Sequence, residues 1–540
     1  MSSSLVVTDL AYAWPDGDAL FDGLDLALTP GRTGLVGANG SGKSTLLRLI
    51  AGSLAPARGS IRVEGGLGYL RQELTLDARL PVDELLGVAA VRRALHAIEA
   101  GSADPAHFEA IGDDWDAEER ARVSLDRLGL RHIGLDRRVG EVSGGEAVLL
   151  GLAAQFVCRP GVLLLDEPTN NLDLAARHRL YDALAAWPDV LLVVSHDRAL
   201  LGLVDQVAEL RDGTVRLFGG TIDDYEETLA VEQDAAERMV RTAESNVRRQ
   251  QRELADARIK LDRRVRYGQK MWDNKREPKI VMGARKRQAQ VSAGKHRTMQ
   301  TEKLDEARHR LTAAEGAVRD DDVIRVDLPE TVLPAGRTVL TARDAVLRNG
   351  LRIDELAVRG PERIALVGAN GSGKTTLLET VAGGLPVGSG ELRVAVPLRY
   401  LPQRLDLLDG AASVAVNVAW FAPDATDNEI RARLARFLFR GDRADQPVAT
   451  LSGGERFRAT LAALLLASPA PQLLLLDEPT NSLDLASARQ LTEALSAYRG
   501  ALVVASHDLP FLRGIGITRW LRLVARDDGP AVEDLATREP

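Results

Sequence analysis

The stretch LVGANGSGKSTLL at residues 35–47 returns almost unchanged as LVGANGSGKTTLL at residues 366–378, an offset of 331. Each copy follows an apolar run and precedes an apolar-periodic segment, which predicts a strand, a glycine-rich loop and a helix. The glycines of such a loop let backbone N–H groups face phosphate oxygens at the positive end of the helix. A chance glycine-rich turn is a poor explanation for one full match and a negligible one for two.

Four further motifs recur in the same order, which predicts two copies of one domain. They are YLRQ at 69–72 and YLPQ at 400–403, SGGE at 143–146 and 452–455, LLLDEPTNNLD at 163–173 and LLLDEPTNSLD at 474–484, and SHD at 195–197 and 506–508. The offset falls from 331 to 309 between the first two of these motifs. The first copy therefore holds extra residues between Gln72 and Ser143.

The loops predict ATP and Mg²⁺ as ligands. Lys43 and Lys374 would reach the β- and γ-phosphates, and Ser44 and Thr375 would ligate Mg²⁺. The remaining loop residues that we expect to bind ATP are Gly37, Ala38, Asn39, Gly40, Ser41, Gly42 and Thr45 in the first copy, and Gly368, Ala369, Asn370, Gly371, Ser372, Gly373 and Thr376 in the second.

Carboxylates follow two apolar runs that resemble buried parallel strands, whose carboxyl ends bind ligands in α/β sheets. Asp166 and Asp477 would hold Mg²⁺, directly or through water. Glu167 and Glu478, one residue further on, would orient or deprotonate the attacking water. A lone apolar-Asp-Glu sequence could be only a strand end with a helix cap, but its repetition behind a phosphate loop favours catalysis.

His196 and His507 each follow another apolar run and could contact the γ-phosphate. A histidine at a strand end is more often structural, and only the repetition favours a catalytic role for these two.

The basic segment at residues 263–297 contains twelve Lys and Arg against two acids, a local charge of +10. The whole chain carries −8, so the remainder carries −18. One interpretation is the solvated tip of a hairpin, and the other is a contact with nucleic acid. The candidate RNA contacts are Arg263, Arg264, Arg266, Lys270, Trp272, Lys275, Arg276, Lys279, Arg285, Lys286 and Arg287.

Composition places the chain among soluble, acidic, intracellular proteins. Its 540 residues have room for two or three domains, and 45% of them are hydrophobic. No unbroken apolar run reaches membrane-spanning length, and the single cysteine excludes an internal disulfide framework. We therefore expect a cytoplasmic location.

The ordered motifs, present twice, resemble the paired nucleotide-binding domains of the ATP-binding cassette superfamily. The EPTNNLD and EPTNSLD sequences, two cassettes on one chain, the lack of a membrane domain and the charged linker are similar to the ABC-F branch. The resemblance covers residues from about 5 to about 525. It implies an ATP hydrolase of α/β fold, with two P-loop cassettes joined by an antiparallel helical hairpin.

The resemblance also implies that the cassettes of one monomeric chain dock head to tail around two ATP molecules. Ser452, Gly453 and Gly454 would then complete the first site. Ser143, Gly144 and Gly145 would complete the second. Gln72 and Gln403 would bind ATP and Mg²⁺ in their own cassettes.

Family members act as translation factors or as ribosome-protection determinants against antibiotics, so the resemblance implies rRNA and tRNA as partners. The alternatives are a DNA-associated ATPase, because cations attract both kinds of phosphate, and the ATPase subunit of a transporter. A long basic linker between fused cassettes would obstruct docking on membrane domains, which disfavours the transporter.

The predicted domains are cassette 1 at 1–222, a basic helical hairpin at 223–320, cassette 2 at 321–525 and a short tail at 526–540. Apolar residues at alternating spacings of three and four predict two helices packed as an antiparallel coiled coil. Gly268, Pro278 and Gly283 are expected to break the helices at the hairpin tip. Tyr12 or Trp14 could stack on adenine in cassette 1, whereas cassette 2 offers no aromatic residue there. The two sites are therefore expected to be unequal.

Overall fold

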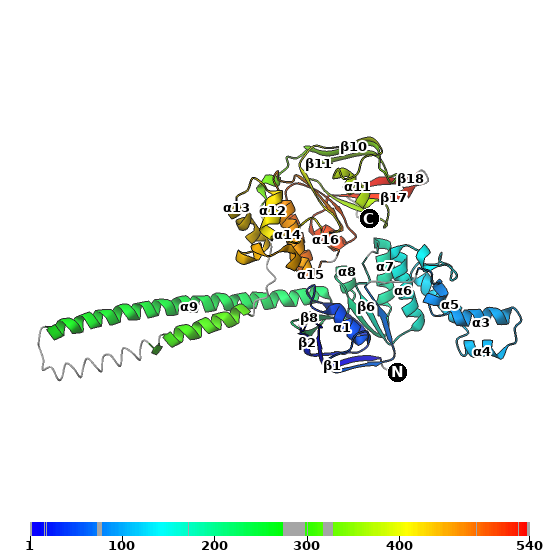
Figure 1. Ribbon diagram of the computed structural model, residues 1–540, viewed down its shortest axis with the longest axis horizontal. Coiled ribbons are helices and arrows are strands. Elements are labelled where there is room, and N and C mark those ends of the chain that lie inside the picture. The colour runs from blue at the N-terminus through cyan, green and yellow to red at the C-terminus, as the bar shows by residue number, and fades with distance from the viewer. Residues whose placement is uncertain are drawn as a thin grey trace. The chain divides into compact units, whose positions relative to one another are not determined.

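The computed structural model describes residues 3–273 except 16, 18, 73–77 and 171; residues 298–299 and 301–316; and residues 328–536 except 405, 482 and 527–528. The chain forms two compact units, Met1–Asp223 with Val323–Pro540, and Asp224–Asp322. The first unit contains both cassettes, and the second contains the linker (Figure 1).

Cassette 1 is built on a largely parallel sheet with the strand order β5-β6-β7-β3-β8-β9, in which only β9 runs antiparallel to its neighbour. A second, antiparallel sheet has the order β2-β1-β4. The strands are β1 (Ser4–Ala13), β2 (Ala19–Leu28), β3 (Gly31–Val36), β4 (Arg58–Glu64), β5 (Leu67–Leu70), β6 (Val162–Asp166), β7 (Val190–Val194), β8 (Gln206–Arg211) and β9 (Thr214–Gly219).

Cassette 1 has eight α-helices among its described residues, and four of them, α2 to α5, lie between Gln72 and Ser143, where the sequence predicted extra residues. They are α1 (Lys43–Ile50), α2 (Val82–Leu85), α3 (Ala89–Glu99), α4 (Pro105–Ile111), α5 (Ala117–Arg127), α6 (Gly144–Cys158), α7 (Leu174–Ala185) and α8 (Arg198–Leu201). Every residue of β6 and β7 is buried, as expected of parallel strands covered on both faces. Leu46 and Leu47 of α1 pack against Leu164 and Leu192 of these strands, which fixes the helix over the sheet.

Cassette 2 repeats this topology in one continuous sheet of order β13-β10-β11-β18-β17-β12-β16-β15-β14. Its strands are β10 (Thr338–Val346), β11 (Arg352–Arg359), β12 (Arg363–Gly368), β13 (Ser389–Val394), β14 (Leu398–Leu401), β15 (Leu473–Asp477), β16 (Ala501–Ala505), β17 (Arg519–Arg526) and β18 (Gly529–Ala536). Its helices are α11 (Lys374–Val381), α12 (Val414–Phe421), α13 (Asp427–Leu434), α14 (Gly453–Leu465), α15 (Leu485–Ala497) and α16 (Leu509–Gly514). The α/β fold with two P-loop cassettes is confirmed.

Strand β18 corrects the expected short tail at 526–540. It pairs antiparallel with β17 and contacts β11 through Arg352 and Ala531. Ala531 is buried and Val532 packs against the apolar core of this cassette. The consecutive acidic residues Glu533 and Asp534 interrupt the alternation of polar and apolar residues that predicts a strand, so β18 is not apparent from its sequence pattern.

The linker is a helical hairpin. Helix α9 (Ile222–Asp273) has 52 residues, a length of about 80 Å at the usual rise. A return helix occupies residues 301–316. The two helices lie side by side in Figure 1. Val247 of α9 packs with Leu304 and Ala307 of the return helix, and Leu254 and Leu311 join them. The antiparallel helical hairpin is confirmed.

Helix α9 continues through Gly268, where the sequence predicted a break. A single glycine costs a helix only about 1 kcal/mol, which the surrounding helix formers offset. Pro278 and Gly283 lie outside the described residues.

Replacing Leu304 by Ala should loosen the hairpin, because the leucine is 6% exposed at a small apolar contact. We expect about 2 kcal/mol less protection against amide hydrogen exchange in the helix around Val247. The matched control is Arg308→Ala in the same helix, whose side chain is 59% exposed. Equal exchange in both variants would contradict the coiled-coil packing.

Candidate functional site

In cassette 1 the lysine of the phosphate loop is hydrogen-bonded to carbonyl groups of the same loop. The Lys43 ammonium donates hydrogen bonds to the Gly37 carbonyl at 2.8 Å and the Ala38 carbonyl at 3.0 Å. Gly42 precedes α1 with φ near +100°, a left-handed conformation that glycine adopts without steric cost. Lys43 is 7% exposed, and this burial lowers its pKa, while the charges of Glu167, Asp484 and Asp166 oppose the shift.

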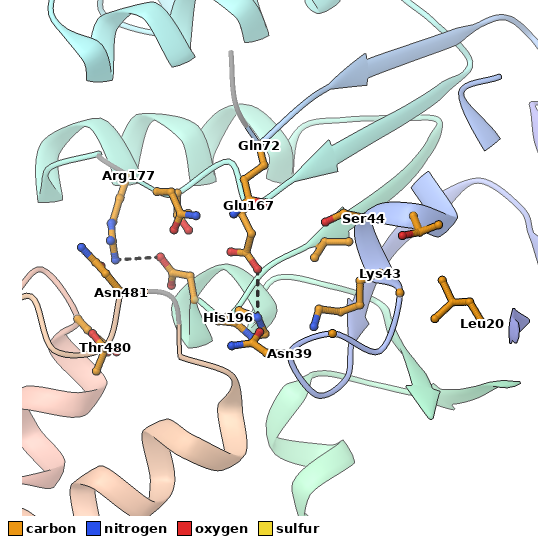
Figure 2. Close-up of a pocket in the computed structure, with 18 of the residues that line it drawn as sticks. Leu20, Asn39, Lys43, Ser44, Gln72, Glu167, Arg177, His196, Thr480 and Asn481 are labelled. Carbon is orange, nitrogen blue, oxygen red and sulfur yellow. Dashed lines mark hydrogen bonds and ion pairs between the residues drawn. The ribbon is translucent and has the colours of Figure 1, made fainter. Parts of the chain in front are cut away.

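The carboxylates from β6 meet this loop at the end of the sheet. The Ser44 hydroxyl donates to Asp166 Oδ1 at 3.0 Å. Glu167 has φ near +49°, and its N–H donates to the Val194 carbonyl of β7. His196, which follows β7, places Nε2 3.3 Å from Glu167 Oε1 (Figure 2). The structure therefore brings together the residues that we predicted to hold Mg²⁺ and to position water.

Glu167 and His196 are in contact, and burial favours the uncharged form of both side chains. Burial raises the pKa of Glu167 to about 8, and the nearby Lys43 charge opposes that shift. Burial also lowers the pKa of His196 to about 4, with Lys43 acting in the same direction. A general base is most effective when its pKa lies near the working pH, so Glu167 has the character that proton abstraction requires.

Cassette 2 places the corresponding groups in a similar way, with one additional contact. Lys374 Nζ donates to the Gly368 carbonyl at 2.8 Å and lies 3.0 Å from His507 Nε2. His507 Nε2 is also 3.4 Å from Glu478 Oε1. Burial raises the pKa of Glu478 to about 7 and lowers that of His507 to about 3.

The two cassettes contribute to each other's sites. The Asn39 N–H of the first phosphate loop donates to Asp484 Oδ2 at 3.0 Å. Asp484 also accepts from the Ser487 N–H at the start of α15, so one carboxylate serves both cassettes. In the other direction, Leu172 and Arg177 of cassette 1 line the cavity of cassette 2.

Most of the predicted ATP-binding residues line one of two cavities. The first has a volume of about 440 Å³ and the second about 370 Å³, within the range of small-molecule sites. The predicted residues that line the first are Asn39, Gly40, Gly42, Lys43, Ser44, Thr45, Gln72, Glu167 and His196. Those that line the second are Asn370, Gly371, Gly373, Lys374, Thr375, Thr376, Gln403, Asp477, Glu478 and His507.

The two SGG segments are not among the described residues that line either cavity. Ser143 and Ser452 instead cap their own helices, α6 and α14, through reciprocal bonds with Glu146 and Glu455. The assignment of these segments to the opposite ATP sites stays a prediction.

The structure adds residues that the sequence analysis did not assign. Tyr400 of β14 donates to Asp477 at 3.4 Å, and burial and the nearby charge of Asp166 raise the pKa of Tyr69 on β5. Both tyrosines belong to the repeated YLRQ and YLPQ motifs, so the offset of 331 was a usable signal. Arg177 also lines both cavities, and no repeated motif marks it.

The two cavities differ in their lining near the predicted adenine contacts. Trp14 lines the first cavity, and its ring centroid lies 5.4 Å from that of Tyr12 in an edge-to-face pair. Asn349 lines the second cavity, where the sequence offered no aromatic residue. The predicted inequality of the sites therefore has a structural basis.

The buried oxygens at these sites fit ATP and Mg²⁺. Within the described part of the chain, the hydroxyls of Ser41 and Ser372 are buried without a hydrogen-bond partner, as groups that await phosphate oxygens would be. A hydroxyl with a carboxylate, Ser44 with Asp166, is a donor set that Mg²⁺ accepts, since this ion keeps several waters and needs few protein ligands.

The candidate RNA contacts are only partly described. Arg263, Arg266 and Lys270 are exposed on α9. The side chains of Arg264, Trp272, Lys275, Arg276, Lys279, Arg285, Lys286 and Arg287 lie outside the described residues.

Two phosphate loops, each with a carboxylate pair at the end of a parallel strand, define a tandem ATP-binding cassette ATPase. A family model described as ABC transporter matches residues 21–170 and 351–481. The chain belongs to the ABC-F family of these proteins, and it binds ATP and hydrolyses it.

The relatives extend over almost the whole chain. Tylosin resistance ATP-binding protein TlrC of Streptomyces fradiae is 34% identical over 538 residues, 91% of this chain and 92% of that protein. Probable ATP-binding protein YheS of Escherichia coli is 31% identical over 513 residues, 92% of this chain and 75% of that protein.

A solved structure with the same fold is RNase-L Inhibitor, with a TM-score of 0.61 and 19% identity, covering 98% of this chain and 91% of that one. Another is an archaeal ribosome recycling factor in complex with a ribosomal stalk protein, with a TM-score of 0.60 and 20% identity, covering 97% and 89%. In the part of the chain that the structure describes, no helix combines the length and apolarity needed to cross a bilayer.

Alanine at Gly37 should impair ATP binding far more than alanine at Gly40. A Cβ on Gly37 would lie 2.4 Å from the Leu210 carbonyl oxygen, whereas one on Gly40 would meet nothing within 4 Å. Both glycines have positive φ, so the pair separates the clash from the loss of backbone freedom. We expect Gly37→Ala to raise the dissociation constant of a fluorescent ATP analogue about tenfold or more, and Gly40→Ala to raise it less. Equal constants would contradict the loop geometry.

Proposed function

We propose that this ABC-F ATPase acts in the cytoplasm on the ribosome, as a translation factor or in ribosome protection against antibiotics, and that its basic linker segment contacts rRNA and tRNA. The observation that carries the proposal is the segregation of charge along the chain. Residues 263–297 carry +10 while the remainder carries −18. Such a segment attracts polyphosphate partners and releases their counterions on binding.

The first part of this segment, residues 263–273, lies in α9 and supports the proposal. Arg263, Arg266 and Lys270 are exposed on α9, where their charges are accessible to a partner. A purely structural spacer gains nothing from concentrating cations of one sign, because like charges on neighbouring helical turns repel each other. The relative from Streptomyces fradiae is named for tylosin resistance, which favours the antibiotic branch of the proposal.

In the ATP sites we assign roles by position. Lys43 and Lys374 would bind phosphate oxygens in place of their present loop carbonyls. Asp166 and Asp477 would hold Mg²⁺, together with Ser44, Thr375 and the nearby Gln72 and Gln403. The bound ion supplies neutralisation of phosphate charge.

Glu167 and Glu478 would take a proton from water at the γ-phosphate, and His196 and His507 would hold these glutamates and the phosphate. The Ser143–Gly145 and Ser452–Gly454 segments would approach the opposite sites on closure, with helix N-termini that favour anions.

The paired variant Glu167→Gln with Glu478→Gln should bind ATP and lose turnover. Glutamine keeps the size and the polarity of the side chain but cannot accept a proton, so we expect kcat to fall about a hundredfold or more with ATP affinity retained. The measurement is phosphate release by the purified protein beside ATP binding. Each single variant should retain the turnover of the other site, and the two should differ. Normal turnover in the double variant would refute the assignment.

Reversing three charges at Arg285, Lys286 and Arg287 to Glu should weaken co-sedimentation with ribosomes in a non-hydrolysable ATP analogue. The salt dependence of binding should also flatten, because each lost phosphate contact removes about one released counterion. The matched control reverses Arg248, Arg249 and Arg252, which are exposed on α9 outside the segment. We expect the control to bind ribosomes like the unmodified chain and both variants to keep basal ATPase activity.

The alternatives predict other outcomes of the same experiment. Binding to duplex DNA with no ribosome binding would favour a DNA-associated ATPase. Recovery of the protein with membranes would favour a transporter subunit. Susceptibility of a deletion strain to ribosome-targeting antibiotics, tylosin included, would then separate resistance from a role in ordinary translation.

A further inference from the structure

Arg177 lies in the first turn of α7, four residues after the end of the repeated motif LLLDEPTNNLD. Its Nε donates to the Leu172 carbonyl at 3.2 Å, and its Nη1 donates to Asp197 Oδ2 at 3.2 Å. The side chains of Arg177 and Asp197 are 10% and 7% exposed, so this pair is buried. Tyr181 also donates to Asp197 Oδ2, at 2.6 Å. The guanidinium therefore joins the segment before α7 to the segment that carries His196.

The same side chain faces both ATP sites. Arg177 lines the cavity of cassette 1 and that of cassette 2, as does Asn481. Figure 2 shows Arg177 on the side of the first cavity from which Thr480 and Asn481 enter. Glu478 and His507 line the second cavity together with Arg177, so the guanidinium charge shares that cavity with both side chains.

Cassette 2 has no counterpart at the matching position. The offset of 311 that relates the two SHD motifs carries Arg177 onto Ala488 and Tyr181 onto Thr492. The matching aspartate is present, since Asp197 corresponds to Asp508, which also lines the first cavity. Asp508 caps α16 by accepting from the Phe511 N–H at 3.0 Å. Two equivalent aspartates are thus present, and the one in cassette 1 accepts a hydrogen bond from Arg177, whose position is taken by Ala488 in cassette 2.

We propose that Arg177 is a positioning residue shared by the two ATP sites, which it serves in different ways. In site 1 it fixes the His196–Asp197 segment through hydrogen bonds that need its planar guanidinium. In site 2 it contributes a positive charge beside Glu478 and the phosphate-binding cavity. Because only cassette 1 supplies such a residue at this position, Arg177 is one source of the inequality between the sites. This inference rests on the glutamate roles proposed above.

A purely structural role is the competing explanation. Removing one partner of a buried ion pair destabilises a protein whether or not the pair matters for catalysis. Arg92 provides the matched control, because its side chain is 11% exposed and pairs with Asp83 and Asp136. It lies on α3, and it is not among the residues that line either ATP cavity.

The experiment measures kcat and KM for ATP at each site separately. Glu167→Gln leaves turnover to site 2, and Glu478→Gln leaves it to site 1. Into each background we would introduce Arg177→Ala, Arg177→Lys or Arg92→Ala, and record the melting temperature of every variant. Lysine keeps the charge but lacks the planar fork of donors.

We expect Arg177→Ala to lower kcat about tenfold in both backgrounds, the effect of losing one charge-assisted hydrogen bond, with little change in KM. Arg177→Lys should restore kcat where site 2 works and not where site 1 works. Arg92→Ala should lower the melting temperature and leave kcat unchanged.

Three outcomes would overturn the proposal: unchanged kcat in Arg177→Ala, an effect in one background only, or equal rescue of both backgrounds by lysine. If the double glutamine variant turns over normally, the glutamate roles fail. Comparison of Arg177→Ala with Arg92→Ala in the unmodified chain then still decides whether Arg177 acts on turnover.

Discussion

The burial of a lysine ammonium beneath its own loop is the interaction on which the rest of each cassette depends. Lys43 and Lys374 are both 7% exposed, and each donates to two carbonyls of the loop that precedes it. A buried cation is costly unless opposite charge lies close by. Each parallel sheet meets this need by ending one strand, β6 or β15, in a pair of carboxylates near the loop. The cavity left between cation and carboxylates is suited to a ligand that carries both phosphate and a metal ion.

The two sites share this arrangement and differ around its edges. An edge-to-face aromatic pair stands at the first cavity, and an asparagine stands at the second. Both histidines lie beside their glutamates, and His507 Nε2 also lies 3.0 Å from Lys374 Nζ. These differences concern both the aromatic lining and the histidine beside the phosphate loop, so we expect the two sites to bind or turn over ATP at different rates.

The linker concentrates basic residues of the chain. Its two helices are held by a short apolar seam of Val247, Leu304 and Ala307, and most of its other described side chains are exposed. An apolar seam this small leaves α9 to rely on helix propensity and on pairs four residues apart, such as Glu237 with Arg241. The energetic role of the linker is thus to present a charged surface rather than to stabilise a core.

The sequence by itself determined the class of fold, the number of cassettes, the phosphate loops and the carboxylates, because these depend on local patterns that occur twice at fixed offsets. It also determined the helical hairpin, since the spacing of apolar residues is a local property. It misplaced the end of cassette 2, because β18 lacks a regular alternation of polar and apolar residues and depends on its pairing with β17. It likewise misjudged Gly268, whose effect depends on the helix around it.

Only the tertiary structure decided which side chains from distant segments meet. Asp484 bonds to Asn39 across 445 positions, and no local pattern encodes such a pair. Arg177 is unremarkable as a residue of an amphipathic helix, and its importance arises because folding places it between Asp197 and the second cavity. The physical reason is the same in each case. A buried polar group needs a hydrogen-bond or charge partner, and the tertiary packing decides which residue lies close enough to be that partner.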